Sequence, residues 1–306
     1  MMAPSEYAVK HSYFAIIFDL SRGKQALLSI AQPALGALLA LGTFPEPDVL
    51  IMGLLAAAAG YFAVFSLNDV LDYKVDREAL KAGKAESQGH DIDVTFLRHP
   101  LARGDISLMA ACAWVTVLAS TSAILAYLLN PICLLLFLGC VALEVLYCAM
   151  RSLSWLKTLV SGIMVGLGGL AGWAAVAPLT AGAGYFFGFL ALWEIAGRNL
   201  PNDLADIDAD RKVGIKTVAT VFGKRASAYA TVVGALATIA LVATLPIPVT
   251  PRLAGIGIGV WSMGIPALVL AGTPSSIQAA AYFNRASLFP ALALAALLLS
   301  MIAGAL

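Results

Sequence analysis

The chain has 306 residues, of which 60% are hydrophobic and only 12% are charged, and its mean hydropathy is +0.88. These values lie outside the range of soluble domains and indicate an integral membrane protein. The 19 Lys and Arg residues nearly balance the 18 Asp and Glu residues, so the net charge of +1 gives no reason to expect a nucleic acid partner. Nothing in the sequence points to an obligate protein partner.

Apolar stretches long enough to cross a bilayer recur along the whole chain. A spanning helix needs roughly 20 mostly apolar residues, and backbone polar groups in lipid must be satisfied within the segment, which favours helices. The sequence therefore predicts an all-α bundle of nine transmembrane helices in a single domain, 1–306, with related halves near 25–150 and 157–306. The predicted spans are 25–43, 49–67, 107–129, 131–149, 157–178, 183–200, 227–246, 253–272 and 287–305.

The basic residues fall almost entirely on one side of this predicted bundle. Eighteen Lys and Arg residues lie on the side of the N-terminus, and only Arg252 lies on the other. Positive residues concentrate in cytoplasmic loops of membrane proteins. We therefore expect a cytoplasmic N-terminus and cytoplasmic polar cap loops near 68–106 and 200–226. In a bacterial or archaeal cell the membrane would be the inner or plasma membrane.

Two acidic motifs interrupt the apolar pattern, one after the second predicted span and one after the sixth. Both read Asn-Asp-x-x-Asp-x-x-x-Asp. Their members are Asn68, Asp69, Asp72 and Asp76 in the first motif, and Asn202, Asp203, Asp206 and Asp210 in the second. Positions i, i+3 and i+7 of a helix share one face, so each motif is expected to crowd three carboxylates on one helix face. Helix capping fits poorly, because the C-terminal end of a helix disfavours negative charge.

A divalent cation would relieve the repulsion among these carboxylates. Mg²⁺ prefers oxygen ligands and is commonly held by a few carboxylates together with substrate phosphates. The same side of the bundle carries basic residues suited to phosphate oxygens, although the bias toward basic cytoplasmic loops accounts for most of them individually. They are Arg22, Arg77, Arg98, Arg103, Arg151, Lys157, Arg198 and Lys216. Carboxylates, a divalent cation and basic side chains at the mouth of an apolar bundle predict a substrate with a diphosphate head and a hydrocarbon tail, such as an allylic prenyl diphosphate.

Over most of its length the chain resembles the UbiA superfamily of intramembrane prenyltransferases. The resemblance rests on both acidic motifs and on four further features: RKVGIKT after the second motif, HPLARGDIS at 99–107, YCAMR at Tyr147 to Arg151, and Arg22 before the first span. Three departures stand out. His99 replaces a usual Arg, Arg151 replaces a usual Lys and changes the donor geometry, and the polar segment 81–96 lengthens the loop after the first motif.

The resemblance implies a role for each matched residue. Asn68, Asp72, Asp206 and Asp210 are implied as ligands of Mg²⁺ and diphosphate, with Asp69, Asp76 and Asp203 as supporting metal ligands. Arg22, Tyr147, Arg151, Lys157 and Lys216 are implied as diphosphate contacts, and Arg98 and Arg103 are further candidates in the loop after the first motif. Asp72, Asp206, Tyr147 and Arg151 are expected to carry the catalysis. The implied reaction is Mg²⁺-dependent transfer of a prenyl group to a lipophilic acceptor, with an aromatic or quinone precursor favoured.

Three alternatives remain open at this stage. A terpene cyclase would capture the allylic cation within the same molecule, and a non-aromatic lipid would serve as acceptor in the same reaction. A cation-coupled transporter is disfavoured, because transporter sites usually lie near the membrane midplane. Inside the predicted spans the only carboxylates are Glu144 and Glu194, which occur singly.

Overall fold

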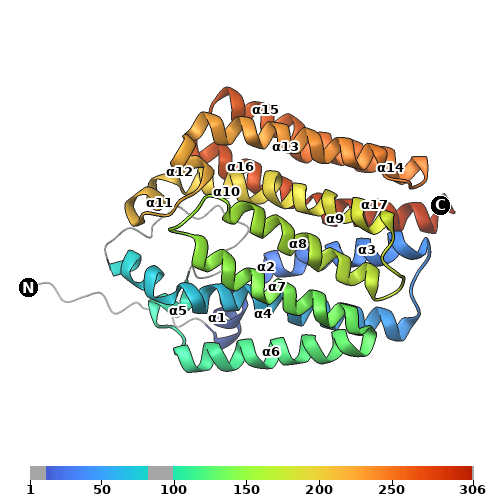
Figure 1. Ribbon diagram of the computed structural model, residues 1–306, viewed down its shortest axis with the longest axis horizontal. Coiled ribbons are helices and arrows are strands. Elements are labelled where there is room, and N and C mark those ends of the chain that lie inside the picture. The colour runs from blue at the N-terminus through green and yellow to red at the C-terminus, as the bar shows by residue number, and fades with distance from the viewer. Residues whose placement is uncertain (1–11, 82–98, 305–306) are drawn as a thin grey trace, which may run out of the picture.

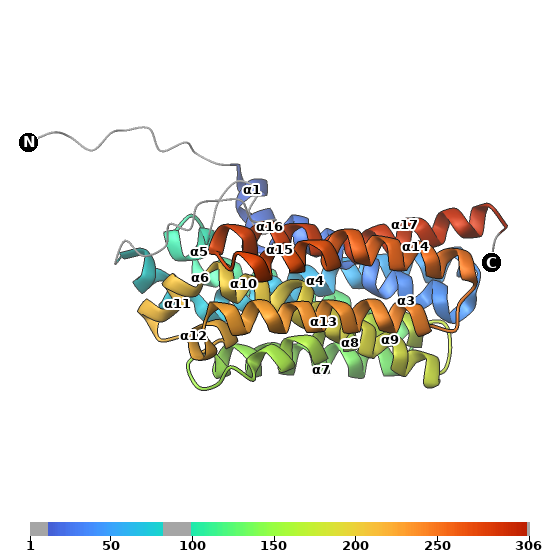
Figure 2. The same cartoon turned by 90° about the horizontal axis from the view of Figure 1, so that it is seen from above.

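The computed structural model describes residues 12–81 and 99–304, and the regular elements in these ranges are helices, with no strand among them. The long helices run side by side along one axis and form an elongated bundle (Figure 1). Seen from above, the short helix α1 (Tyr13–Leu20) lies on the outside of the bundle near the end where the chain begins (Figure 2). The structure confirms the all-α class.

The helices follow one another with short connections. After α1, the first half contains α2 (Gly23–Ser29), α3 (Ala31–Leu41), α4 (Pro47–Lys81), α5 (Pro100–Arg103), α6 (Leu108–Leu129) and α7 (Pro131–Met150). The second half contains α8 (Lys157–Ala174), α9 (Ala181–Trp193), the π-helical segment η1 (Glu194–Asn199), α10 (Leu200–Ala205), α11 (Ile207–Val213), α12 (Val218–Phe222), α13 (Lys224–Thr244), α14 (Val249–Gly259), the π-helical segment η2 (Val260–Gly264), α15 (Ile265–Gly272), α16 (Ser276–Ala286) and α17 (Phe289–Ile302).

Within the described residues, seven helical segments are long and apolar enough to cross a membrane. They are Gly23–Leu41, Pro47–Glu78, Leu108–Leu129, Pro131–Met150, Lys224–Thr244, Val249–Gly272 and Ser276–Ile302. The other two predicted spans, 157–178 and 183–200, form helices α8 and α9 with η1, but α8 is rich in glycine and η1 carries charged residues. The protein is therefore an integral membrane protein, while nine crossings, their orientation and the two related halves stay predictions.

The two acidic motifs differ in their local backbone. Helix α4 continues unbroken to Lys81, so the carboxylates of the first motif share one helix, as predicted. In the second motif the helix breaks at Asp206, where φ is −93° and ψ is 8°, and resumes in α11. The prediction of one continuous helix face is therefore wrong for the second motif. Pro201 lacks an N–H for the helical ladder just after the π-helical turn, and Asp side chains compete with the backbone and favour helix ends.

Close packing of α3 on α8 depends on glycine. A Cβ at Gly172 would lie 1.9 Å from the carbonyl oxygen of Pro33, and a Cβ at Gly36 would lie 2.6 Å from that of Gly169. Small residues at such positions let helix backbones approach closely in membranes, where helix association relies on van der Waals packing. The two helices therefore meet backbone to backbone, and their separation is set by the absence of side chains.

Replacement of Gly172 by Ala is expected to lower the melting temperature of the protein in detergent. The added methyl group would meet backbone atoms, which cannot rotate away, so we expect a cost of about 1–3 kcal/mol or more. The matched control is Gly184→Ala on α9, where no atom lies within 4 Å of the added Cβ. That variant should be as stable as the wild type or more so, because Ala is the better helix former. Equal melting temperatures for the two variants would contradict the packing argument.

Candidate active site at the charged end of the bundle

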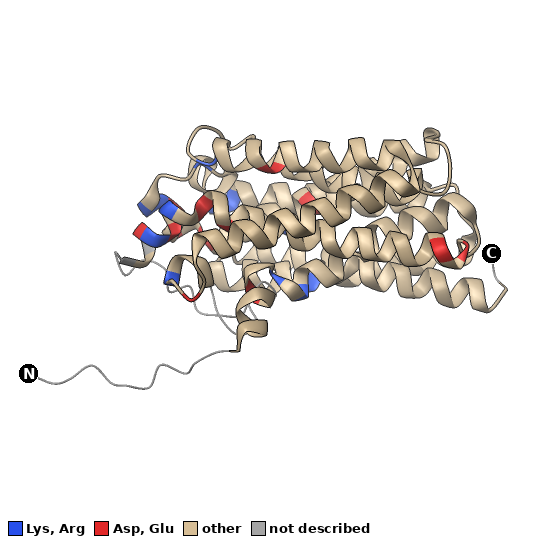
Figure 3. Ribbon diagram, turned by 90° about the horizontal axis from the view of Figure 1, so that it is seen from below, with Lys and Arg blue, Asp and Glu red and all other residues tan. Residues whose placement is uncertain are grey.

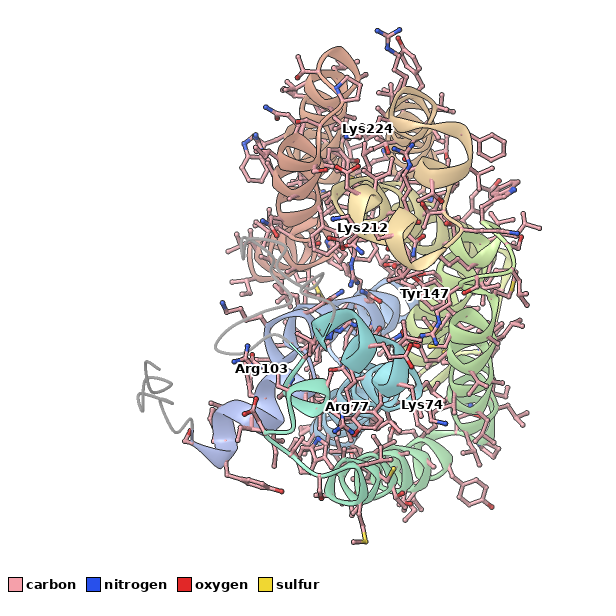
Figure 4. All side chains as sticks on the ribbon, turned by 90° about the vertical axis from the view of Figure 1, so that its left-hand side faces the viewer. Lys74, Arg77, Arg103, Tyr147, Lys212 and Lys224 are labelled. Carbon is pink, nitrogen blue, oxygen red and sulfur yellow. The ribbon has the colours of Figure 1, made fainter. Side chains whose placement is uncertain are left out.

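Charged residues are concentrated at one end of the bundle, around the end of α4 and the short helices α5 and α11 (Figure 3). Figure 4 looks into this end of the molecule. Tyr147 lies between the end of α4, which carries Lys74 and Arg77, and the segment of α11 that carries Lys212. The two acidic motifs therefore belong to opposite sides of one site, with α7 between them.

Asn68 connects three elements at the start of the first motif. Its Oδ1 accepts a hydrogen bond from Nη2 of Arg22 at 2.8 Å, and its Nδ2 donates to Oε1 of Glu144 at 2.6 Å. The same Nη2 of Arg22 lies 3.5 Å from Oδ1 of the buried Asp69. Arg22 has a positive φ of 46°, a conformation that costs energy for a residue other than glycine. These contacts place its guanidinium against the motif.

The remaining carboxylates of the first motif also face basic partners. Asp72 forms an ion pair with Arg151 at the end of α7, which shows that the Arg at this position reaches the motif. Oδ2 of Asp76 lies 3.2 Å from Nδ1 of His99, the residue before α5. Each Asp of the first motif thus has a basic side chain within ion-pair distance.

The second motif is anchored by a cluster of the half-buried Tyr147 with the buried Lys157, Asn199 and Asp203, which we call the Lys157 cluster. Nζ of Lys157 lies 3.0 Å from Oδ1 of Asp203 and donates to Oη of Tyr147 at 3.1 Å. Nδ2 of Asn199 donates to the same Oη at 3.3 Å. Oδ2 of Asp203 and Oδ1 of Asn199 are buried and accept no hydrogen bond from the described residues. The cluster therefore holds two oxygens that lack a donor or a cation.

Two carboxylates of the second motif have a raised pKa. Burial, then the neighbouring Asp203 and Asp206, raise the pKa of Asp210 to about 7, against the opposing effect of Lys157. Burial likewise raises the pKa of Asp203, and Lys157 again opposes the shift. Desolvation and like charge both disfavour the ionised form, so a bound cation would stabilise these carboxylates.

Two other predicted diphosphate contacts, Arg103 and Lys216, are exposed. Arg103 pairs at 3.5 Å with Asp105 of its own loop, and half of its side chain (52%) is exposed. Lys216 is exposed, and its backbone N–H donates to the carbonyl oxygen of Arg151 at 2.8 Å, which ties the segment after α11 to the end of α7. Arg98 and nearly all of the polar segment 81–96 lie outside the described residues. The roles of all these residues stay predictions.

A cavity of about 1350 Å³, including its open mouth, extends from this site into the bundle. On α4 its lining runs from Asn68 to Gly53, which at 1.5 Å per residue corresponds to roughly 22 Å. Its walls are mainly small or apolar side chains. Polar groups are present too, and they include Arg22, Asn68, Glu144, Tyr147, Glu194, Arg198, Asn199 and Asn202. The cavity suits an amphiphile whose head lies at the charged end and whose tail lies among the helices.

One polar group of this cavity was missed at the level of sequence. Glu194, treated above as a single carboxylate, lies 3.3 Å from Nη1 of Arg198, one helical turn away, and accepts a hydrogen bond from Ser161 at 2.9 Å. All three side chains are buried. The available signal was the i, i+4 spacing of an acid and a base inside an apolar span, where ionisable residues are expensive and usually functional.

The side chains at this site fit a magnesium ion by chemistry, although they are not already assembled around one. Among the residues that the structure describes, no group of three His, Cys, Asp or Glu side chains is arranged to hold a metal ion. The donors are carboxylate and amide oxygens, which hard cations prefer, and two of them, in Asp203 and Asn199, have no hydrogen-bond partner. A diphosphate with its cations would supply what these oxygens lack.

The chain is similar in sequence to known prenyltransferases. The profile of the UbiA prenyltransferase family matches residues 30–289. A digeranylgeranylglyceryl phosphate synthase of Thermococcus gammatolerans is 28% identical over 258 residues, which is 80% of either chain. A 4-hydroxybenzoate octaprenyltransferase of Vibrio atlanticus is 32% identical over 182 residues, which is 59% of this chain and 58% of the relative.

Solved structures share the fold. The structure of a UbiA homologue from Aeropyrum pernix covers 90% of this chain and 98% of its own, with a TM-score of 0.69 and 21% identity. That of a UbiA homologue from Archaeoglobus fulgidus bound to DMAPP and Mg²⁺ covers 92% and 98%, with a TM-score of 0.67 and 18% identity. The match of the family profile to most of the chain shows that this protein belongs to the UbiA prenyltransferase family.

Proposed function

We propose that this protein transfers a prenyl group from an allylic prenyl diphosphate to a lipophilic acceptor in a Mg²⁺-dependent reaction. The observation that carries the proposal is a mostly apolar cavity that ends at paired carboxylates and basic side chains. The homologue from Archaeoglobus fulgidus, which has the same fold, binds DMAPP and Mg²⁺. The distribution of Lys and Arg supports a cytoplasmic mouth for the cavity.

The side chains of the site divide between metal and diphosphate. Asn68, Asp72, Asp206 and Asp210 would hold Mg²⁺, with Asp69, Asp76 and Asp203 in support. Bound there, Mg²⁺ supplies neutralisation of the charge that develops on the leaving diphosphate. Arg22, Tyr147, Arg151 and Lys157 already converge on the motifs. They would donate to phosphate oxygens in charge-assisted hydrogen bonds.

Ion-pair exchange explains how a diphosphate enters a site that is already neutralised. Lys157 forms an ion pair with Asp203 of the second motif, and Arg151 forms one with Asp72 of the first. A diphosphate with its cations offers phosphate oxygens to these basic groups and positive charge to the carboxylates, so each partner is replaced by an equivalent one. The carbon–oxygen bond of the donor then breaks, its electron pair leaves with the diphosphate, and the acceptor bonds to the freed carbon. The apolar walls of the cavity keep water away from that carbon.

Two classes of acceptor fit this reaction. Aromatic and quinone precursors are the class favoured from the sequence, and the Vibrio relative is named for 4-hydroxybenzoate. The relatives that cover most of the chain are named for digeranylgeranylglyceryl phosphate, which is a lipid. A terpene cyclase would need no acceptor at all. The acceptor therefore has to be identified by product analysis.

Purified protein in detergent should release diphosphate from geranyl, farnesyl or geranylgeranyl diphosphate only when Mg²⁺ is present. The acceptor panel should contain 4-hydroxybenzoate, a dihydroxynaphthoate and geranylgeranylglyceryl phosphate, with products followed by mass spectrometry. A mass-shifted acceptor is the expected result and names both substrates. A terpene hydrocarbon or alcohol formed alone would support a cyclase instead, and no release from any donor would overturn the proposal.

Loss of a motif carboxylate should abolish turnover without unfolding the protein. Asp72→Ala and Asp206→Ala are each expected to lower turnover about 100-fold or more, because removing a group that stabilises developing charge costs about that much. The matched control is Asp208→Ala. Its side chain is 69% exposed and lies 3.8 Å from Lys224, its ion-pair partner. Full turnover in folded Asp72→Ala and Asp206→Ala proteins would exclude a role for the motifs.

Cavity length should set the preferred donor. Ala57 lies on the cavity wall eleven residues before Asn68, roughly 16 Å along α4. Ala57→Leu is expected to lower kcat/KM for geranylgeranyl diphosphate roughly 5- to 150-fold more than for geranyl diphosphate, because an overfilled site costs about 1–3 kcal/mol. An equal loss for both donors would show that the tail does not reach this part of the cavity.

A further inference from the structure

A second polar level lies in the cavity beyond the Lys157 cluster, and its central side chain is Glu194. Oε1 of Glu194 accepts a hydrogen bond from Oγ of Ser161 at 2.9 Å, and Oε2 lies 3.3 Å from Nη1 of Arg198. Despite this proximity, the buried Oε2 accepts no hydrogen bond from any residue that the structure describes. A buried acceptor without a donor costs roughly 1–3 kcal/mol, and more when it is charged. Because Glu194 lines the cavity, the missing donor can come from a bound molecule.

The position of Glu194 along the cavity follows from its neighbours. Ser161 stands four residues after Lys157 on α8, which places it roughly 6 Å further into the bundle. Lys157 is held at the diphosphate end by Asp203 and Tyr147. When the diphosphate of a donor lies at Lys157, its reacting carbon therefore lies near the level of Ser161 and Glu194. The new bond forms at that level.

The local backbone holds Glu194 in place. Glu194 begins the π-helical segment η1, and Arg198 lies one turn further on. Such π-helical turns are rare and frequently occur at functional sites. The guanidinium of Arg198 lies 5.5 Å from the ring centroid of Trp193 and 5.9 Å from that of Phe283, where aromatic faces stabilise a cation. Arg198 is thereby fixed beside Glu194 by contacts that do not involve the diphosphate end.

We propose that Glu194 is a catalytic residue that receives the hydrogen bond and then the proton of the acceptor's hydroxyl group, while Ser161 and Arg198 position its carboxylate. This inference rests on the proposed transferase function. One carbon–oxygen bond of the donor breaks and its electron pair leaves with the diphosphate. For an alcohol, one bond forms between the hydroxyl oxygen and the freed carbon, and the hydroxyl proton passes to Oε2 of Glu194. For a phenol alkylated on a ring carbon, the hydroxyl proton passes to Oε2 as the carbon–carbon bond forms, and the proton of that ring carbon then moves to the phenol oxygen, which restores the aromatic ring. The acceptor is thus an alcohol or a phenol.

A purely structural ion pair predicts a different pattern of effects. If Glu194 only stabilised the bundle, its replacement would lower the melting temperature and weaken the donor and acceptor steps together. If Glu194 takes the proton, its replacement weakens only the step that involves the acceptor. The ratio of acceptor prenylation to donor hydrolysis by water separates the two.

The test compares Glu194→Gln with the wild type and with Glu46→Gln, a control at an exposed carboxylate outside the cavity. Three quantities are measured in detergent: Mg²⁺-dependent binding of geranyl diphosphate, hydrolysis of the donor without acceptor, and prenylation of the acceptor identified by the panel. Glu194→Gln should lower the kcat of prenylation about 100-fold or more, as expected for loss of a general base. Donor binding and donor hydrolysis should stay within about twofold of the wild type, because neither step involves Glu194.

Prenylation by Glu194→Gln at the wild-type rate, or a parallel fall in donor hydrolysis, would overturn the inference. Ser161→Ala provides a second variant in case Glu194→Gln does not fold, since it keeps the ion pair and removes only one hydrogen bond. It should raise the KM for the acceptor several-fold and leave that for the donor unchanged, as expected for loss of one bond to a charged group. Unchanged acceptor kinetics in Ser161→Ala would also count against the inference. A wild-type protein that releases no diphosphate would instead overturn the proposed function, so the two failures are distinguishable.

Discussion

The buried pair of Lys157 and Asp203 is the interaction on which the site depends. Two charges taken out of water are stable only when they are close together and their other hydrogen bonds are satisfied. Lys157 also donates to Tyr147, and Asn199 donates to the same hydroxyl oxygen, so α7, α8, η1 and α10 meet around the pair. Oδ2 of Asp203 still lacks a hydrogen bond from the described residues. The cavity has its polar end where these four elements meet. Any anion that displaces Asp203 from Lys157 must bring its own positive charge to compensate the carboxylate, as the proposed metal-bound diphosphate would.

Close packing on one side of the bundle is compatible with open space on the other. Glycines bring α3 and α8 into backbone contact. Helix α8 also supplies Ser161, which lines the cavity, and Lys157, which pairs with Asp203. A rigid α8 keeps Lys157 and Ser161, which mark the proposed donor and acceptor levels of the cavity, one helical turn apart. Packing in the apolar part of the bundle thus determines the spacing of the chemical groups, because both depend on the same helix.

The long helices and the first acidic motif were predictable from sequence because each depends on a local pattern. Apolar runs of sufficient length predict helices in lipid whatever their neighbours, and α4 keeps its 3.6-residue period past the apolar run.

The break at Asp206 was not predictable in this way, since Asp203 and Asp210 keep helical spacing in the sequence and the break depends on the proline and the π-helical turn before it. The pairing of Asp76 with His99 joins residues separated by a long polar segment, and no periodicity relates them. Helix α16, which supplies Phe283 to the cavity, lies between two predicted spans. A search for long apolar runs overlooks it because polar residues interrupt its apolar ones, although their spacing is that of an amphipathic helix.

Charge is distributed along the cavity in a way that separates two tasks of the proposed reaction. At the mouth, carboxylates and basic groups are present in comparable number, so they can exchange partners with an anion and its cations at little net electrostatic cost. One turn deeper, Glu194 and Arg198 neutralise each other, and Oε2 of Glu194 is a buried acceptor that receives no hydrogen bond from the described residues. An anionic diphosphate is disfavoured beside that oxygen, whereas a neutral hydroxyl group is favoured. The donor head and the acceptor hydroxyl are thereby sorted to different levels by electrostatics, which brings the reacting carbon and its nucleophile together between them.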